Sequence, residues 1–284
     1  EKLVKDYCRE LEVNFHTEKA DVKKIADKSG LSFEMTGRQL RYDFFYELSQ
    51  ILGDAKIATA HIQSDNTETL FLRLISGTGL QGMTGIQVKR DKIIRPLLFA
   101  NKKDLYQYAK NCDIPFHDDH TNFENDCQRN VVRNILLPKM RQELNPNIDQ
   151  TLENFSIIMT EHLSYNRKRA KRFFSQCLTV QYSWYLKLDF DNLKKLETIL
   201  RKEVLLMSFK NLYNKINSYP SFHYMNQIED LIFSSSTGRF IEPYKNIVVL
   251  VDRENLIVIN KEKLAWEEAE IKPGKIYTRD SFIF

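Results

Sequence analysis

The stretch that most constrains this chain is residues 56–86, where a short apolar segment runs into a polar turn, a helix and a glycine-rich loop. Lys56–His61 is typical of a short buried strand, and the helix is expected to open at Asp65 or Asn66. A strand that delivers polar side chains to a helix N-terminus is where open α/β sheets place their ligands. Asp65 and Glu68 share one helix face, so they are a candidate pair for binding a cation or an ammonium group.

Length and composition indicate a folded protein of two domains. The chain has 284 residues, more than one typical domain, and 42% of them are hydrophobic, which is enough for a core. The net charge of +4 permits a polyanionic partner without requiring one. The four cysteines form no CxxC pair, so we expect free thiols of a reducing compartment. No apolar run approaches the ~20 residues of a membrane span, and no signal peptide opens the chain, so a cytoplasmic protein without a membrane partner is predicted.

Charged residues recur at helical spacing elsewhere in the first half of the chain. Ser32 is expected to cap a helix over Phe33–Leu52, in which Glu34 and Arg38 lie four apart and can pair on one face. Arg95 precedes a proline, so it is expected at a strand end and not in a helix.

Arg129 and Arg133 are four residues apart and are expected to project from one helix face. Two neighbouring cations are unfavourable unless an anion lies between them. The two alternatives are a bound anion and local pairing with Asp118, Asp119 or Asp126.

The second half is expected to begin near Asn147 with a long helix over 149–178. This helix carries a basic run beside the aromatic residues Tyr165, Phe173 and Phe174. Such a run is either a solvated face or a surface for RNA phosphates. The run consists of Arg167, Lys168, Arg169, Lys171 and Arg172.

The rest of the second half alternates between strand and helix patterns. The expected elements are a strand over Tyr182–Leu188, a turn over Asp189–Leu193, helices over Lys194–Asn214 and Phe222–Phe233, and a hairpin of Ile247–Val251 with Leu256–Asn260.

The segment from His61 to Thr69 resembles the H-H-x-D-D-Q-x-E-T motif of the tRNA(Ile)-lysidine synthetases. His61, Asp65, Glu68 and Thr69 match, whereas the second His, the first Asp and the Gln of the motif are replaced. Three further family motifs have counterparts here, E-x-x-x-R-x-x-R-Y, I-x-R-P-L-L and D-x-S-N-x-d-x-x-x-R-N-x-x-R. The first motif matches at Glu34, Arg38, Arg41 and Tyr42, and the second at Arg95. The third matches at Asp119, Thr121, Asn122, Arg129, Asn130 and Arg133.

The resemblance implies an α/β fold. Residues 1–147 would form a Rossmann-like, parallel-sheet PP-loop ATPase domain, and residues 148–284 a mainly helical α+β domain for tRNA recognition. The family's S-G-G-x-D-S loop, which wraps the pyrophosphate of ATP, has no counterpart in the sequence. We therefore expect the catalytic domain to be N-terminally incomplete.

The resemblance also implies a carbon–nitrogen ligase that uses ATP and Mg²⁺. The enzyme would join L-lysine to C2 of the wobble cytidine in a tRNA(Ile) precursor with a CAU anticodon. Asp65 and Glu68 are assigned to lysine or magnesium, with Asp65 the candidate Mg²⁺ ligand, and Arg129 and Arg133 to the lysine carboxylate or the adenylate phosphate. His61 and Arg38 are assigned to the nucleotide. The residues assigned to tRNA are Arg41, Arg95, Asn122, Asn130 and the basic run from Arg167 to Arg172.

Two alternatives to lysidine synthesis stay open at this point. One is a related PP-loop ATPase that thiolates tRNA, although Cys112 and Cys127 are poorly placed for sulfur transfer. The other is a non-catalytic fragment that only binds tRNA. The oligomeric state is also open, with a homodimer among the alternatives.

Overall fold

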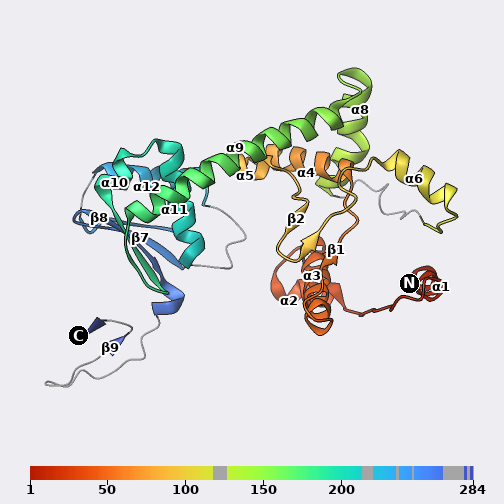
Figure 1. Ribbon diagram of the computed structural model, residues 1–284, viewed down its shortest axis with the longest axis horizontal. Coiled ribbons are helices and arrows are strands. Elements are labelled where there is room, and N and C mark those ends of the chain that lie inside the picture. The colour runs from red at the N-terminus through yellow and green to blue at the C-terminus, as the bar shows by residue number, and fades with distance from the viewer. Residues whose placement is uncertain are drawn as a thin grey trace. The chain divides into compact units, whose positions relative to one another are not determined.

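The computed structural model describes residues 1–117, 127–212, 220–234, 237–244, 246–264, 278–279 and 282–283. The chain divides into two compact units, residues 1–160 and 161–284 (Figure 1). The predicted tRNA residue Asn122 and the acidic residues Asp118, Asp119 and Asp126 lie outside the described residues.

The first unit combines helices with a small sheet. Its helices are α1 (Lys2–Glu10), α2 (Val22–Ser29), α3 (Phe33–Ile51), α4 (Gln63–Ile75), α5 (Leu80–Met83), α6 (Lys102–Asn111), α7 (Gln128–Val131), the π-helical turn η2 (Val132–Leu136), α8 (Leu137–Glu143) and the start of α9 (Ile148–Cys177). Its strands are β1 (Ile57–Ala58), β2 (Lys89–Arg90) and β3 (Ile93–Ile94). The strand order is β1-β3-β2, with β1 parallel and β2 antiparallel to β3.

Side-chain caps fix the helix starts in this unit. The Ser32 hydroxyl accepts the Met35 N–H at 3.2 Å, so α3 begins where the sequence predicted. Helix α4 begins at Gln63, two or three residues before the predicted start at Asp65 or Asn66, because Asp65 caps it from the third helical position. The Asp65 carboxylate accepts the N–H of Ile62, whose backbone is still extended. The preceding strand is shorter than predicted and covers only Ile57–Ala58.

The second unit is built on a five-stranded antiparallel sheet with the order β4-β5-β8-β7-β6. The strands are β4 (Leu178–Gln181), β5 (Tyr185–Asp189), β6 (Phe240–Tyr244), β7 (Ile247–Asp252) and β8 (Asn255–Asn260), and the helices are α10 (Phe190–Lys195), α11 (Thr198–Leu212) and α12 (Phe222–Ser234). The remaining elements are the short helix η3 (Lys261–Leu264) and strands β9 (Thr278–Arg279) and β10 (Phe282–Ile283), which pair as a separate two-stranded sheet.

Alternate residues of the central strands are buried, and they pack with α11 and α12 into one apolar core. The predicted hairpin of β7 and β8 and the predicted helix α12 are confirmed. The predicted turn over Asp189–Leu193 is wrong. Asp189 caps the short helix α10 by accepting the Asn192 N–H at 2.8 Å, and the aspartate that suggested a turn is the helix start.

Candidate active site at the N-terminus of α4

The first turn of α4 places Asp65 beside an arginine from a distant part of the chain. One Asp65 oxygen, Oδ2, accepts the Ile62 N–H at 2.9 Å. The other, Oδ1, accepts a hydrogen bond from Nη2 of Arg129 at 3.0 Å. The Thr69 hydroxyl donates to the Asp65 carbonyl at 2.7 Å. Asp65 therefore has a fixed orientation, and its side chain keeps part of its surface exposed.

Glu68 is the buried centre of the same cluster, with only 2% of its surface exposed. Its carboxylate accepts hydrogen bonds from Nε of Arg129 at 2.7 Å and from Nε and Nη2 of Arg133 at 2.6 and 2.9 Å. Nη2 of Arg133 also lies 3.6 Å from Oδ1 of Asp65. The hydrogen bond to Glu68 raises the pKa of Arg133. All four residues predicted as catalytic thus form one ion-pair cluster.

The cluster explains why two arginines share one helix face. Arg129 lies in α7 and Arg133 in η2, and both guanidinium groups reach the same carboxylate. A buried Glu68 is stable only when paired and hydrogen-bonded, which these two side chains provide. The π-helical turn around Arg133 adds a local irregularity of the kind that is frequent at functional sites.

His61 lies in the segment between β1 and α4, and its Nδ1 is 2.9 Å from the Thr59 hydroxyl. Burial lowers the pKa of His61 below its usual value of 6.5. The negative charge of Asp65 opposes this effect, whereas the positive charges of Arg95, Arg38 and Arg129 add to it. Three arginines are therefore close enough to lower the pKa of His61.

This lowered pKa predicts a pH-dependent contribution to stability. In the unfolded chain the imidazole takes up a proton near pH ~6.5, and in the folded protein it does so only at lower pH. The contribution of His61 to stability is therefore fully present above the unfolded-state pKa of about 6.5. It is lost as the pH falls from there through the lower pKa of the folded state. A His61→Gln variant is expected to show a flatter fall of the free energy of unfolding below about pH 6.5. The exposed His16, changed to Gln, is the matched control. A slope unchanged by His61→Gln would contradict the prediction.

Arg38 and Arg95 add positive charge near the cluster. The Arg38 guanidinium lies over the Tyr42 ring at 5.0 Å from its centroid. Arg95 is 5% exposed and donates from Nη1 to the Gln87 carbonyl at 2.6 Å. Its buried Nε has no hydrogen-bond partner among the described residues. Among the described residues, Asp65 and Glu68 balance Arg129 and Arg133, and the two further arginines add positive charge that suits an anion.

The other residues predicted to contact tRNA are more scattered. Arg41 is exposed on α3, and Asn130 lies half-buried in α7. In the basic run of α9, Arg167 lies 3.7 Å from Glu203 of α11, and the Arg169 guanidinium is 5.7 Å from the Tyr165 ring centroid. The exposed members without an ion pair among the described residues are Lys168, Lys171 and Arg172.

Sequence reasoning missed two residues that hold the glycine-rich loop. The buried Asn66 accepts the Ile86 N–H at 2.6 Å. Arg73 donates to the carbonyls of Gly82 and Gly85 at 2.8 and 2.9 Å. An arginine between apolar residues of a helix that precedes a glycine-rich loop was the available signal for Arg73.

Gly85 is expected to be the least replaceable glycine of this loop. Its φ is +65°, and an added Cβ would lie 2.2 Å from Oδ1 of Asn66. Gly77 has a similar φ of +74° but open space around it, so Gly77→Ala is the matched control. Gly77→Ala is expected to cost about 1–2 kcal/mol of backbone strain. Gly85→Ala is expected to cost about 1–3 kcal/mol more, because Asn66 must give up its hydrogen bond. Denaturant unfolding measures both, and equal losses would contradict the predicted contact.

The described residues do not form a magnesium site by themselves. Among them, no three His, Cys, Asp or Glu side chains gather at one point. Both oxygens of Asp65 and of Glu68 already accept hydrogen bonds. A metal at Asp65 would need most of its ligands from elsewhere.

The amino-acid sequence is also similar to known proteins. A family model described as a PP-loop domain matches residues 1–140. Residues 1–140 of this mixed α/β chain are thus similar to a PP-loop domain. Among the described helices, none is long and apolar enough to cross a membrane.

Similarity to particular enzymes extends beyond that domain. The tRNA(Ile)-lysidine synthase of Clostridium tetani is 32% identical over 249 residues, which are 85% of this chain and 51% of the relative. That of Clostridioides difficile is 29% identical over 260 residues, 91% and 56% of the two chains. That of Caldanaerobacter subterraneus subsp. tengcongensis is 27% identical over 276 residues, 96% and 58%. The resemblance to tRNA(Ile)-lysidine synthases is confirmed, and the chain spans about half the length of these relatives.

Proposed function

We propose that the protein joins L-lysine to C2 of the wobble cytidine in a tRNA(Ile) precursor with a CAU anticodon, at the expense of ATP. The observation that carries this proposal is the Asp65–Glu68–Arg129–Arg133 cluster at the N-terminus of α4 within a PP-loop domain. The similarity to tRNA(Ile)-lysidine synthases supports the choice of reaction.

The proposed reaction has two steps. In the first, the C2 oxygen of the cytidine attacks the α-phosphorus of ATP, and pyrophosphate leaves. In the second, the ε-amine of lysine attacks C2, AMP leaves with that oxygen, and the nitrogen gives up a proton. Both steps build negative charge on a phosphate, which positioned cations stabilise.

The cluster geometry suggests how the four residues divide these tasks. Glu68 is buried and fully hydrogen-bonded, so its role is to hold Arg129 and Arg133 in place. Asp65 is more exposed, which makes it the better candidate for an ammonium group of lysine. The two arginines would then face the lysine carboxylate or the adenylate phosphate.

His61 and the neighbouring arginines would bind the nucleotide. The positive charges of Arg38 and Arg95 lie near His61, and the Nε of Arg95, which has no partner among the described residues, would be a donor for a phosphate oxygen. The lowered pKa keeps His61 neutral at pH 7, so it would act as a hydrogen-bonding group and not as a cation. Magnesium would bind together with ATP, because the described residues alone do not form a site for it.

The wider assignments are part of the same proposal. Residues 1–147 would be the Rossmann-like catalytic domain, and residues 148–284 the tRNA-recognition domain, in a cytoplasmic enzyme. Arg41, Asn122, Asn130 and the basic run of α9 would contact tRNA.

Thiolation of tRNA is the second candidate, because one cysteine lies beside the cluster. Cys127 immediately precedes α7 and is near enough to Arg133 to contribute to its raised pKa. A thiolating enzyme would need this thiol or another one for sulfur transfer. A Cys127→Ser variant that keeps full activity would exclude Cys127 as the sulfur carrier.

Release of AMP separates the candidates. The protein is incubated with ATP and tRNA(Ile) precursor, with and without lysine, and AMP is quantified. We expect AMP release that needs both tRNA and lysine. AMP release that needs a sulfur donor instead would identify thiolation, and tRNA binding without AMP release would identify a non-catalytic tRNA-binding protein.

A further inference from the structure

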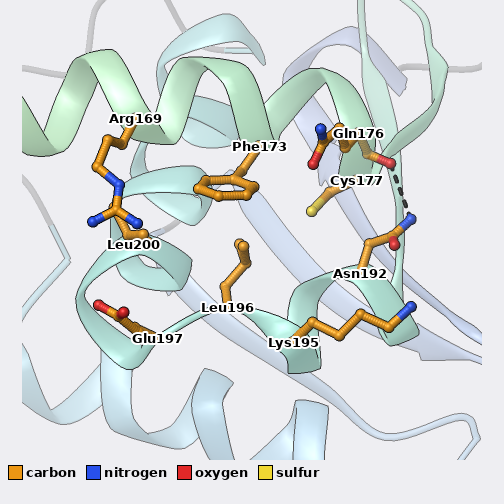
Figure 2. A pocket seen from close by; sticks show the side chains of 9 residues that line it. All are labelled: Arg169, Phe173, Gln176, Cys177, Asn192, Lys195, Leu196, Glu197 and Leu200. Carbon is orange, nitrogen blue, oxygen red and sulfur yellow. Dashed lines mark hydrogen bonds between the residues drawn. The ribbon is translucent and has the colours of Figure 1, made fainter.

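The second unit contains a cavity of about 220 Å³ between α9, α10 and the start of α11 (Figure 2). It lies on the helix that carries the basic run. Its lining residues are Arg169, Phe173, Gln176, Cys177, Asn192, Lys195, Leu196, Glu197 and Leu200.

The inner walls of this cavity are apolar. The half-buried Phe173 and the buried Leu196 project toward each other from opposite walls (Figure 2). Leu200 and Cys177 are also buried. Burial raises the pKa of the Cys177 thiol to about 11, so this side chain is uncharged at neutral pH. Phe174, the next aromatic along α9, is buried in the core and does not line the cavity. Phe173 therefore supplies the one aromatic ring among the lining residues.

The rim of the cavity is polar and carries a cation at each end. Arg169 and Glu197 lie at one end, and Asn192 and Lys195 at the other (Figure 2). The side-chain amide of Asn192 donates to the Gln176 carbonyl at 3.1 Å, which leaves its Oδ1 as an acceptor. Among the described residues, neither Lys195 nor Glu197 has an ion-pair partner. The rim thus offers hydrogen-bonding groups between two positive charges.

We propose that this cavity binds one unpaired nucleobase of the RNA substrate, stacked on Phe173, with Arg169 and Lys195 contacting the phosphates on either side. This inference rests on the proposed function, since it takes tRNA as the substrate. A nucleobase has an apolar face and a polar edge, which match the walls and the rim. The volume is below the roughly 300–1,000 Å³ of sites for whole small-molecule ligands, so it suits a single ring system.

The neighbouring surface favours a nucleotide chain over a free metabolite. The exposed Lys168, Lys171 and Arg172 continue the positive charge along α9 beyond the cavity. A free amino acid would need its carboxylate and ammonium groups matched at one point, whereas cations at two opposite ends match successive phosphates. Stacking on an aromatic ring combined with a basic path along the backbone is the usual way to bind unpaired nucleotides.

The first test is the dissociation constant of the full chain for tRNA(Ile) precursor, measured by fluorescence anisotropy. Phe173→Ala is expected to raise it about 5- to 150-fold, the equivalent of the ~1–3 kcal/mol that one stacked base contributes. Phe173→Trp keeps a stacking surface and is expected to stay close to the wild type. Phe240→Ala is the matched control, since Phe240 is exposed and does not line the cavity.

A second set of measurements guards against misfolding, because Phe173 also packs partly against the core. Lys195→Glu changes only an exposed rim residue and is expected to weaken tRNA binding without lowering the Tm. Ultraviolet crosslinking of the wild-type complex, followed by mass spectrometry, is expected to place a nucleotide adduct on Phe173.

The outcomes separate this inference from the proposed function. Wild-type affinity in folded Phe173→Ala and in Lys195→Glu, while the wild type binds tRNA and releases AMP, overturns the nucleobase site alone. Failure of the wild type to bind any tRNA overturns the proposed function, and the nucleobase site with it.

Discussion

Replacing Glu68 with alanine is expected to lower the stability of the first unit by about 3 kcal/mol, the lower end of the cost of breaking a buried ion pair. Glu68 is almost fully buried and accepts three hydrogen bonds from Arg129 and Arg133. Its loss removes the carboxylate that accepts three hydrogen bonds from these two guanidinium groups. The loss of stability is expected at the lower end of this range because both arginines keep part of their surface in water. Denaturant unfolding of the variant and the wild type gives the difference.

Two control variants separate charge from shape in this cluster. Glu68→Gln keeps the volume but loses the charge, so it is expected to fall between wild type and Glu68→Ala. Asp149→Ala breaks a different pair, in which Arg141 donates from Nε and Nη2 at 2.7 and 2.9 Å, and both side chains there are more exposed than Glu68. It is expected to cost less than Glu68→Ala. Equal losses for Glu68→Ala and Asp149→Ala would show that Glu68 is not the centre of the cluster.

The second large effect is expected on activity, from Arg129→Lys. Arg129 reaches Glu68 through Nε and Asp65 through Nη2, two contacts that a single ammonium group cannot reproduce. If Arg129 also stabilises the phosphate in the transition state, the rate of AMP release should fall about 100-fold, as when one such donor is lost. The measurement is the rate of AMP release at saturating tRNA, ATP and lysine.

Arg141→Lys is the matched control for this prediction. Arg141 also donates from Nε and Nη2 to a carboxylate, but its partner is Asp149 and not the cluster. It is expected to lose stability without a comparable loss of rate. A rate for Arg129→Lys within a few-fold of that for Arg141→Lys would mean that Arg129 has only a structural role.

The long elements of this fold were predictable because their signals are local. Helix α3 has its cap at Ser32, α12 has helical periodicity, and the β7–β8 hairpin has two short apolar runs on either side of a polar turn. The short helix α10 was missed because six residues after a capping aspartate carry little periodicity. Strands β4 and β6 were missed because their assignment depends on pairing with β5 and β7.

Only part of the candidate site could be predicted, because only the contacts within one helix leave a local signal in the sequence. Helical spacing placed Asp65 with Glu68 and Arg129 with Arg133, but each contact between the two pairs spans more than sixty residues of chain. Such a contact is a property of tertiary packing, so spacing alone left the partners of the arginines open. The cavity around Phe173 could not be predicted from the sequence either, because Leu196 on its opposite wall belongs to another segment of the chain.

The most direct test of the account is mass spectrometry of nucleosides from tRNA(Ile) precursor after incubation with the protein, ATP and isotope-labelled lysine. The account predicts that the wobble cytidine gains the mass of lysine less one water and carries the label. It also predicts that this product is lost in Arg129→Lys. An unmodified cytidine with the wild-type protein, or one that carries sulfur in place of lysine, would contradict it.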